Sequence, residues 1–411
     1  MAEAYVLETL RTPRTKASPR GGLHGWSPVE MVSALLQALV ERTGLDPGVI
    51  DDVVLGCASQ VAEQGANLAR TATLLSGWGA HIPGVTVNRF CASGIDSVAS
   101  AAASIRAGFS RVVVAGGVES VSRVPMFSDG GPLWEHEETM QRIGSIHMGV
   151  AADLIATLEG HDRDQLDAYG LETQQKAARA WAAGFYQRSV VPLPLRPGGD
   201  QGDGGVDSDE HVRPATSAET LAALPAAFES LGAAGQDALA ERSYPQAHPI
   251  RHLHTVGTSP ALADAAALVL LGNLEAAEVS GLAPRARVAG VATAAVDPVI
   301  MLTAGQEAVE RVLDKCGLAP ADVDVFEFAE AFAASCLRFR KALDAGPDRM
   351  NPNGGTIAMG HAFGATGAIL VANCVDELDR RDGRYGVVAV SGAAGLGVAV
   401  LLERSGQRGL R

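Results

Sequence analysis

Short apolar segments alternate with helix-like segments over the first 120 residues, and this alternation constrains the fold more than any other feature. Each apolar segment is typical of a buried strand, and the segments between them carry apolar residues at helical spacing. Short strands separated by helices predict a mostly parallel sheet that helices cover. The sequence therefore predicts an α/β protein with a strand at 4–10, a helix at 27–44, a strand at 50–59, a helix from about Asn67, a helix after Cys91 and a strand at 111–120.

The same alternation returns in the last third of the chain, after a middle region of different character. That region holds one clear helix, at 162–185, and segments rich in Gly, Asp, Ser and Pro, such as 196–217. The two outer parts are compatible with an internal duplication, although they share no obvious sequence identity. We predict an N-terminal half at 1–120 that is completed by about 255–275, a loop domain inserted at 121–250, and a C-terminal half at 276–411.

The composition disfavours several classes of protein. A net charge of −14 argues against nucleic acid or an anionic membrane as a partner. The chain has no run of about 18 uncharged apolar residues, so no transmembrane helix is expected, and its first residues lack a signal-peptide pattern. Five cysteines, an odd number without C-x-x-C spacing, argue against a disulfide framework or a zinc site. We expect a cytoplasmic protein.

Cys91 stands where an apolar, β-prone segment around Val85 and Val87 gives way to an Ala-rich helix that Gly108 ends. A thiol at the start of a helix meets unpaired backbone N–H groups and the positive end of the helix dipole, which both stabilise a thiolate. The alternative is a buried structural thiol, because free cysteines are among the most buried residues. The position favours a nucleophile.

His361 lies in the glycine-rich segment "GGTIAMGHAFGATG" at 354–367. Glycines let a backbone approach a ligand closely, which suits a catalytic loop that leads into a helix. A phosphate-binding loop is the rival interpretation, but the segment matches neither G-x-x-x-x-G-K-[ST] nor a dinucleotide fingerprint. The glycine context predicts a functional histidine.

Four further polar or flexible side chains are candidates. Ser391 follows an aliphatic strand, but it lacks the G-x-S-x-G elbow of a serine hydrolase. Glu330 lies in an apolar run, so we expect its carboxylate to be buried with a partner or to line a site. His147 and Met148 enter a helix, where Met148 either fills the core or contacts substrate.

Eight motifs in order along the chain resemble those of the thiolases, a family that includes acetyl-CoA acetyltransferases and 3-ketoacyl-CoA thiolases. The resemblance covers nearly the whole chain and implies a five-layered αβαβα fold of two similar halves, with a loop domain inserted in the first. The motifs are "RTP" at 11–13, "NRFCASG" at 88–94, "AGGVESVSRVPM" at 115–126, "HMGVAAD" at 147–153, "DEHVRP" at 209–214, "EAFAAS" at 330–335, "NPNGGTIAMGHAFGATG" at 351–367 and "GLGVAVLLE" at 395–403.

The resemblance also implies roles for individual residues. Cys91 would take the acyl group as a thioester, and His361 would activate Cys91 and help to hold the thioester oxygen. The backbone N–H groups of Cys91 and Ala393 would form a second oxyanion hole. A coenzyme A thioester is the implied substrate, with no permanently bound cofactor, and a homodimer or homotetramer is implied. The residues implied to line the acyl and pantetheine pocket are Met148, Ser259, Ala331 and Phe332.

The chain departs from the family pattern at three places in the implied site. Ser391 stands where the family has a second cysteine that acts as a base, and an alcohol is a far weaker acid than a thiol of pKa about 8.5. Ala329 replaces an Asn or His that orders a catalytic water. The histidine motif reads "GHAFG" instead of "GHP", which alters the loop around His361.

A further departure concerns coenzyme A. Pro225 stands in a segment where the family commonly has a basic residue that contacts this ligand. Two alternatives to an acyl-CoA enzyme follow from these departures: a condensing enzyme that uses a carrier-protein thioester, and a catalytically weakened subunit that serves a partner protein. The side chains that could replace the missing charge are Arg213, Arg242, Arg251 and His252.

Overall fold

A single large mixed sheet runs through the molecule in the computed structural model, which describes residues 2–196 and 204–406. Its strand order is β10-β11-β12-β9-β1-β8-β5-β3-β4, with β2 paired to β8, and β6 pairs with β7 separately. The strands are β1 (Tyr5–Arg11), β2 (Thr15–Lys16), β3 (Asp52–Gly56), β4 (Val85–Val87), β5 (Val112–Ser120), β6 (Leu193–Pro194), β7 (Gly205–Val206), β8 (Ala263–Gly272), β9 (Ala286–Ala295), β10 (Val325–Phe328), β11 (Tyr385–Gly392) and β12 (Leu396–Arg404).

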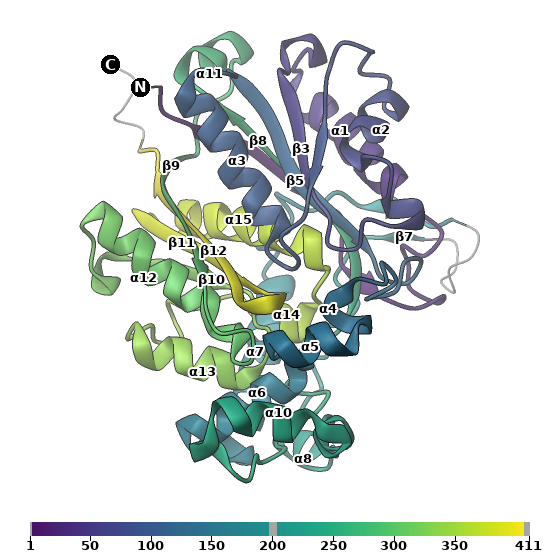
Figure 1. Cartoon of the computed structure of the whole chain (residues 1–411). Coiled ribbons are helices and arrows are strands. Elements are labelled where there is room, and N and C mark those ends of the chain that lie inside the picture. The colour runs from purple at the N-terminus through teal and green to yellow at the C-terminus, as the bar shows by residue number, and fades with distance from the viewer. Residues whose placement is uncertain (1, 197–203, 407–411) are drawn as a thin grey trace.

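Helices cover the sheet and fill the regions between strands (Figure 1). Two short 3₁₀ turns matter for the site, η5 (Met301–Thr303) and η7 (Ala393–Gly395). The α-helices are α1 (Pro28–Thr43), α2 (Leu68–Leu75), α3 (Ser93–Ala107), α4 (Pro132–Glu135), α5 (Glu137–Ile143), α6 (Met148–Glu159), α7 (Arg163–Ala182), α8 (Ala218–Ala222), α9 (Glu229–Leu231), α10 (Asp237–Ser243), α11 (Leu274–Ser280), α12 (Ala304–Cys316), α13 (Ala333–Ala342), α14 (Thr356–Met359) and α15 (Phe363–Arg381).

The expectation of a mostly parallel sheet is wrong. Only β3 with β4, β3 with β5, and β10 with β11 pair in parallel among the described strands; the other pairs are antiparallel. The three-residue turn η7 joins β11 to β12, and so short a connection permits only an antiparallel pair. β8 enters the sheet after the long middle region and runs antiparallel to both β1 and β5.

Three apolar cores define five layers, as predicted for the fold class. Side chains alternate between the two faces of each strand, so each half of the sheet supplies two of the cores. The first core joins α1, α2 and α11 to β1, β3, β5 and β8. The central core holds α3 and α15 between the two halves of the sheet, and the third packs α6, α12 and α13 against β9–β12. The order is therefore αβαβα, with α3 and α15 in the middle (Figure 1).

The two central helices approach each other most closely near their N-terminal ends. A Cβ atom on Gly94 of α3 would lie 2.3 Å from the backbone oxygen of Gly364, and one on Gly367 would lie 2.3 Å from the nitrogen of Ile95. Real Cβ atoms do not approach other atoms so closely, so only glycine fits at these positions. The contact brings the helix after Cys91 against the helix after His361.

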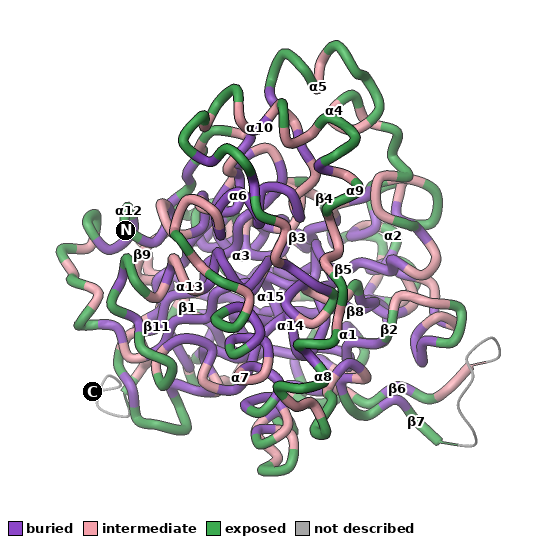
Figure 2. The backbone as a smooth tube through the Cα atoms, turned by 90° about the horizontal axis from the view of Figure 1, so that it is seen from below, coloured by how far each residue is buried: buried purple, intermediate pink, exposed green. Residues whose placement is uncertain are grey.

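Helices α4–α10 lie between β5 and β8 in the chain; α6 is buried in the third core, whereas α4, α5, α8 and α10 are more exposed. Figure 2 shows long exposed stretches around α4, α5, α8 and α10, whereas the sheet and the central helices are buried. Part of the Gly- and Asp-rich segment at 196–217 lies outside the described residues, and the exact domain boundaries remain a prediction. Among the residues that the structure describes, no helix is long and apolar enough to cross a membrane.

Candidate active site

Cys91 lies in a tight turn immediately before α3. Phe90 adopts a positive φ of 50°, and the Ser93 side chain fixes the turn by donating to Phe90 O at 2.6 Å and accepting the Arg89 N–H at 2.8 Å. The prediction that Cys91 stands at the start of a helix is confirmed. Among the turn and loop hydrogen bonds that join backbone groups within residues 2–196 and 204–406, none uses the N–H of Cys91, which lies next to its own thiol.

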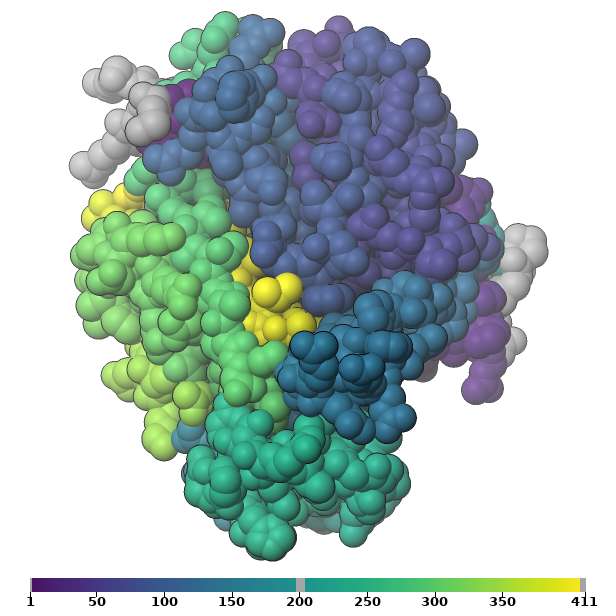
Figure 3. Space-filling model, in the orientation of Figure 1, coloured from purple at the N-terminus to yellow at the C-terminus, as the bar shows by residue number. Residues whose placement is uncertain are grey.

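A cavity of about 30 Å³ lies beside Cys91. Two of the predicted site residues, Met148 and Ala393, line it together with Cys91. Its walls come from the N-terminal half, from the α4 region and from the C-terminal turn η7, and Figure 3 shows these three parts of the chain meeting at the surface. The complete lining is Ala58, Ser59, Phe90, Cys91, Met126, Phe127, Asp129, Trp134, Met148, Phe363 and Ala393.

His361 is buried immediately before α15. Its backbone N–H donates to Ala261 O at 2.7 Å, and its carbonyl accepts the Ala263 N–H at 3.2 Å, so the loop is anchored to the start of β8. The ring nitrogen Nδ1 shares a hydrogen bond of 2.8 Å with Thr366 Oγ1. Phe363 lies edge-on to the imidazole with ring centroids 5.1 Å apart. Because Phe363 also lines the cavity of Cys91, the histidine loop forms one wall of that cavity.

Glu119, at the end of β5, connects the loops around this cavity. Its fully buried carboxylate accepts the backbone N–H groups of Ala58 at 2.9 Å, Ser59 at 3.1 Å and Gly364 at 2.9 Å. Gln64 Nε2 donates to the same carboxylate at 2.6 Å. Ala58 and Ser59 line the cavity, and Gly364 follows the lining residue Phe363. The Glu119 side chain therefore fixes two walls of the cavity relative to each other.

Burial determines the protonation of both candidate catalytic groups. Burial, and then the nearby Glu119 carboxylate, raises the pKa of Cys91 to about 12. Burial, and then Arg14, lowers the pKa of His361 to about 4. The expected stabilisation of a thiolate by the helix start is therefore outweighed at rest, because a buried charge loses its hydration. At neutral pH the site holds a neutral thiol and a neutral imidazole.

The Ser391 hydroxyl is hydrogen-bonded to the backbone at the start of α12. Ser391 Oγ donates to Leu302 O at 2.7 Å and accepts the Gly305 N–H at 2.9 Å. These bonds satisfy one of the unpaired N–H groups at the start of α12. Ser391 does not line the cavity beside Cys91, although Ala393, two residues later, does.

Ala329 and Glu330 follow β10 and occupy different environments. Ala329 is buried in the central core, and its methyl group offers no hydrogen bond to a water. Glu330 accepts hydrogen bonds from Tyr169 Oη at 2.9 Å, Asn351 Nδ2 at 3.1 Å and Ile357 N at 3.1 Å. The prediction that Glu330 is buried with partners is confirmed, and these contacts anchor the start of the histidine loop.

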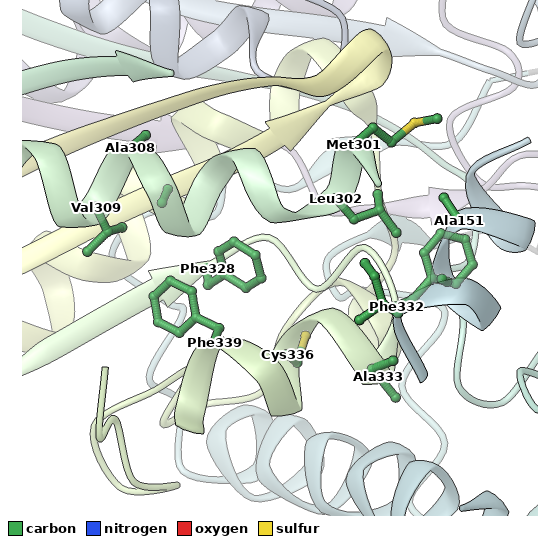
Figure 4. Packing of buried hydrophobic residues seen from close by; sticks show 14 of the residues in the cluster. Ala151, Met301, Leu302, Ala308, Val309, Phe328, Phe332, Ala333, Cys336 and Phe339 are labelled. Carbon is green, nitrogen blue, oxygen red and sulfur yellow. The ribbon is translucent and has the colours of Figure 1, made fainter. Parts of the chain in front are cut away.

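The other predicted pocket residues lie outside the cavity beside Cys91. Ser259 Oγ donates to Thr255 O at 2.7 Å and is buried. Phe332 belongs to the third core, close to Leu302 and Ala151 (Figure 4), and Ala331 packs against the same core while staying partly exposed. These residues do not form walls of that cavity.

A second, larger cavity of about 420 Å³ lies on the side of the inserted helices. It contains Arg213, one of the four predicted replacement charges. The His252 ring is hydrogen-bonded to the carboxylates of Asp153 at 2.9 Å and Asp237 at 3.0 Å. Arg251 donates a hydrogen bond to the carbonyl of His161. The lining residues are Gln174, His211, Arg213, Ala215, Thr216, Thr220, Leu221, Leu224, Val256, Gly257, Ala261 and Ile357.

Sequence reasoning missed most of the cavity lining, and four of the missed residues carry the argument below: Glu119, which holds the walls, and Asp129, Trp134 and Phe363, which line the cavity. Phe363 could have been found, because it follows His361 in the same motif by two positions. Glu119 also stands in a recognised motif, but only the fold brings its carboxylate to Gly364, 245 residues later in the chain. Asp129 and Trp134 lie in a segment that had no recognisable pattern.

The fold and the cavity, with Cys91 in its lining and the loop of His361 beside it, define a class of acyl-transferring enzyme, and comparisons with known proteins agree. Residues 4–237 match the family "Thiolase, N-terminal domain", and residues 282–404 match "Thiolase, C-terminal domain". The chain belongs to the thiolase family. It is a thiolase-type acyltransferase, which confirms the function expected from the sequence motifs.

Individual relatives match over almost their full length. A beta-ketoadipyl-CoA thiolase of Escherichia coli is 35% identical, with 98% of this chain and 100% of the relative covered. A steroid 3-ketoacyl-CoA thiolase of Mycobacterium tuberculosis is 33% identical, with 98% and 95% covered. The solved structure of human mitochondrial 3-ketoacyl-CoA thiolase has a TM-score of 0.86 at 27% identity, with 98% of this chain and 99% of that chain covered.

Proposed function

We propose that this thiolase transfers acyl groups from coenzyme A thioesters through a thioester on Cys91. The observation that carries the proposal is the placement of Cys91. Its thiol lies beside a cavity, its backbone N–H makes no turn or loop bond to another backbone group among the described residues, and the loop of His361 forms a wall of the same cavity. A nucleophile, a neutral base and a free oxyanion donor are the groups that acyl transfer requires.

The first half of the reaction follows from the two neutral groups. Neutral His361 accepts the thiol proton of Cys91 as the sulfur attacks the carbonyl carbon of the thioester. The N–H groups of Cys91 and Ala393 hold the developing oxyanion. The bond to the sulfur of coenzyme A then breaks, and that thiolate takes the proton from the imidazolium. Acyl-Cys91 and free coenzyme A are the products.

The second half depends on the acceptor of the acyl group. In the thiolytic direction, coenzyme A attacks acyl-Cys91 after a 3-ketoacyl-CoA has been cleaved and acetyl-CoA has left. That cleavage needs an acid that protonates the α-carbon of the departing acetyl-CoA enolate, and Ser391, whose hydroxyl is bonded to Leu302 and Gly305, is poorly suited to the task. We therefore propose that carbon–carbon bond chemistry is slow in this chain compared with simple acyl transfer or hydrolysis.

The same observation favours a second candidate function. A chain that has the nucleophile Cys91, but whose Ser391 hydroxyl is held by hydrogen bonds, could form a complex with a partner subunit that carries out the second half of the reaction. Co-purification of a stoichiometric partner, with thiolytic activity only in the complex, would support this candidate. Full thiolytic activity of the isolated chain would exclude it.

We propose that the larger cavity receives the remainder of coenzyme A. Arg213 lines it and would face an anionic ligand in a chain whose net charge is −14. Coenzyme A is then a substrate and not a resident cofactor, because Cys91 and His361 supply the reacting groups. Poor saturation by acyl-CoA, together with fast transfer from an acylated carrier protein, would favour the carrier-protein alternative.

We also propose a homo-oligomer in the cytoplasm. β4 is the edge strand of the sheet, and exposed apolar side chains gather on β4 and neighbouring α2: Val85 at 43%, Leu74 at 51% and Leu75 at 53% exposed. Such an edge is suited to pairing with a second copy of the chain. All five cysteines are free thiols, which suits a reducing compartment.

A burst of free coenzyme A tests the proposed function. Mixing the enzyme with excess acetyl-CoA should release about one equivalent of coenzyme A per active site before the slower steady state, as measured by chromatography. Cys91→Ala should abolish the burst, and His361→Ala should slow it by about 10²–10⁴-fold. Cys316→Ala is the matched control and should keep the burst. A burst that survives Cys91→Ala would overturn the proposal.

A further inference from the structure

The walls of the cavity beside Cys91 are largely apolar, and this bears on which acyl groups the enzyme accepts. The inference rests on the proposed function, in which the acyl group is bonded to Cys91. At about 30 Å³ the cavity exceeds the roughly 10–15 Å³ that a single water needs, so it suits a short chain. The apolar side chains of the lining, besides alanines, are Phe90, Met126, Phe127, Trp134, Met148 and Phe363.

An aromatic cluster closes one side of this cavity. The ring of Trp134, from α4, lies 5.4 Å from the ring of Phe90 in an edge-on arrangement and 4.8 Å from the ring of Phe127. Trp134 Nε1 donates to Asp129 Oδ1 at 3.0 Å. The cluster is therefore held in place by packing and by one hydrogen bond, and it presents apolar ring atoms to the acyl group.

Asp129 is the one ionisable side chain besides the Cys91 thiol among the described residues that line the cavity, and no Lys, Arg or His lines it. The nearby cations in the sequence are paired elsewhere: Arg89 with Asp96 at 2.9 Å, and Arg123 with Glu63. A carboxylate at the end of an acyl chain would therefore lose its hydration without gaining a cation. It would also face the negative charge of Asp129.

We propose that this site accepts short apolar acyl groups and discriminates against acyl groups that end in a carboxylate, with Asp129 as the specificity-determining residue. An unpaired charge is costly to bury against apolar walls, and the exposed carboxylate of Asp129 repels a like charge beside it. The substrate class thus differs from the one that the name beta-ketoadipyl-CoA thiolase gives for relatives at 35% identity.

Two coenzyme A thioesters of equal chain length test the proposal. Butyryl-CoA ends in a methyl group and succinyl-CoA in a carboxylate, and each would transfer its acyl group to Cys91 with release of coenzyme A. Single-turnover acylation, followed by mass spectrometry, should be about tenfold or more faster with butyryl-CoA, since like charges several ångströms apart repel by an energy of that order. High salt should shrink the ratio, because it screens the repulsion.

The variant Asp129→Asn removes the charge and keeps an oxygen that can accept the Trp134 N–H. The ratio of butyryl to succinyl rates should fall severalfold toward one, and it should lose its dependence on salt. Glu135→Gln is the matched control, because Glu135 is an exposed acid of α4 that does not line the cavity; it should keep the wild-type ratio.

Separate results would overturn the inference and the proposed function. Equal rates with the two thioesters in the wild type, or an unchanged ratio in Asp129→Asn, would overturn the inference while acyl transfer to Cys91 stands. The wild-type ratio and its salt dependence need no variant, so a folding defect in Asp129→Asn leaves the inference falsifiable. Failure of butyryl-CoA, succinyl-CoA and acetyl-CoA alike to label Cys91 would overturn the proposed function itself.

Discussion

The carboxylate of Glu119 accepts the backbone N–H of Gly364 at 2.9 Å and thereby ties the loop of His361 to the strand behind Cys91. The same carboxylate holds Ala58 and Ser59, which form another wall of the cavity. It also lies close enough to Cys91 to raise the pKa of that thiol. Glu119 therefore has two separable effects, one on the position of the loops and one on the protonation of the nucleophile.

Glu119→Gln tests both effects. The amide replaces an oxygen that accepts backbone N–H groups, so we expect the free energy of unfolding to decrease by about 2 kcal/mol. Removing the negative charge should lower the pKa of Cys91, so the rise of its alkylation rate by iodoacetamide should shift to lower pH. Exposed Glu138→Gln is the control and should change neither quantity. An alkylation profile that shifts to higher pH would contradict the assigned electrostatic effect.

The pH dependence of acylation tests whether Cys91 and His361 are both neutral at rest. Because the pKa of His361 is lowered to about 4 and that of Cys91 is raised to about 12, the acylation rate should show no inflection near pH 6.5. A single-turnover rate measured from pH 5 to pH 9 checks this. A titration midpoint close to 6.5 would mean that the imidazole is hydrated and ordinary, contrary to its buried position.

The lowered pKa of His361 also predicts how stability changes with acid. The unfolded chain binds a proton on this histidine below about pH 6.5, whereas the folded chain does not until about pH 4. Stability should therefore be lost as pH falls through this interval, by up to about 3 kcal/mol from this group. His361→Asn should show a smaller decrease of melting temperature between pH 7 and pH 5 than the wild type.

Restoring the family residues tests the effect of Ser391 and Ala329. The double variant Ser391→Cys with Ala329→Asn should raise thiolytic cleavage of a 3-ketoacyl-CoA, because it supplies a thiol that protonates the acetyl-CoA enolate more readily than an alcohol does, and a hydrogen bond for water. Ser391→Cys alone is the control; it weakens the bonds to Leu302 and Gly305 and should melt at a lower temperature than the wild type. A folded double variant without any gain would show that this chain uses other groups for the step.

Glu327 should be a destabilising residue at neutral pH. Burial, and then Glu377 and Glu330, raises its pKa well above the usual value, and a nearby Asn373 side chain offsets this only in part. The unfolded state releases this proton above about pH 4.5 while the folded state keeps it, so stability falls as pH rises from there. Glu327→Gln should therefore have a higher melting temperature than the wild type at pH 8, and the difference between the two should be smaller at pH 5.

Exposed Glu137→Gln is the matched control for this comparison, since it removes an acid without removing a buried one. It should leave the difference in melting temperature between pH 8 and pH 5 unchanged. If Glu327→Gln also leaves that difference unchanged, the carboxyl of Glu327 is paired or hydrated in solution.

The local elements of the fold could be predicted from the sequence, because their signals are local. The helix after Cys91 ends at Gly108, which adopts a positive φ of 79°, and the helix from about Asn67 begins at Leu68, with Asn67 as its cap. Strand direction could not be predicted, because it depends on where β8 re-enters the sheet after the middle region. A parallel sheet was the natural expectation from alternation alone.

The candidate site was only partly predictable for a similar reason. Cys91 and His361 stand in motifs, but the protonation of both depends on burial, which a helix-start argument does not reveal. The orientation of Ser391 toward α12 depends on a contact with residues almost 90 positions earlier in the chain. Long-range contacts of this kind leave no pattern in a single sequence.

The position of the acyl group tests the central claim most directly. The enzyme would be incubated briefly with acetyl-CoA, quenched in acid and digested, and the acetyl mass increment would be located by peptide mass spectrometry. We expect the increment on Cys91 and not on the other four cysteines, and much less of it in His361→Ala. An unlabelled Cys91 in folded wild-type enzyme, or a label on another residue, would contradict acyl transfer through Cys91.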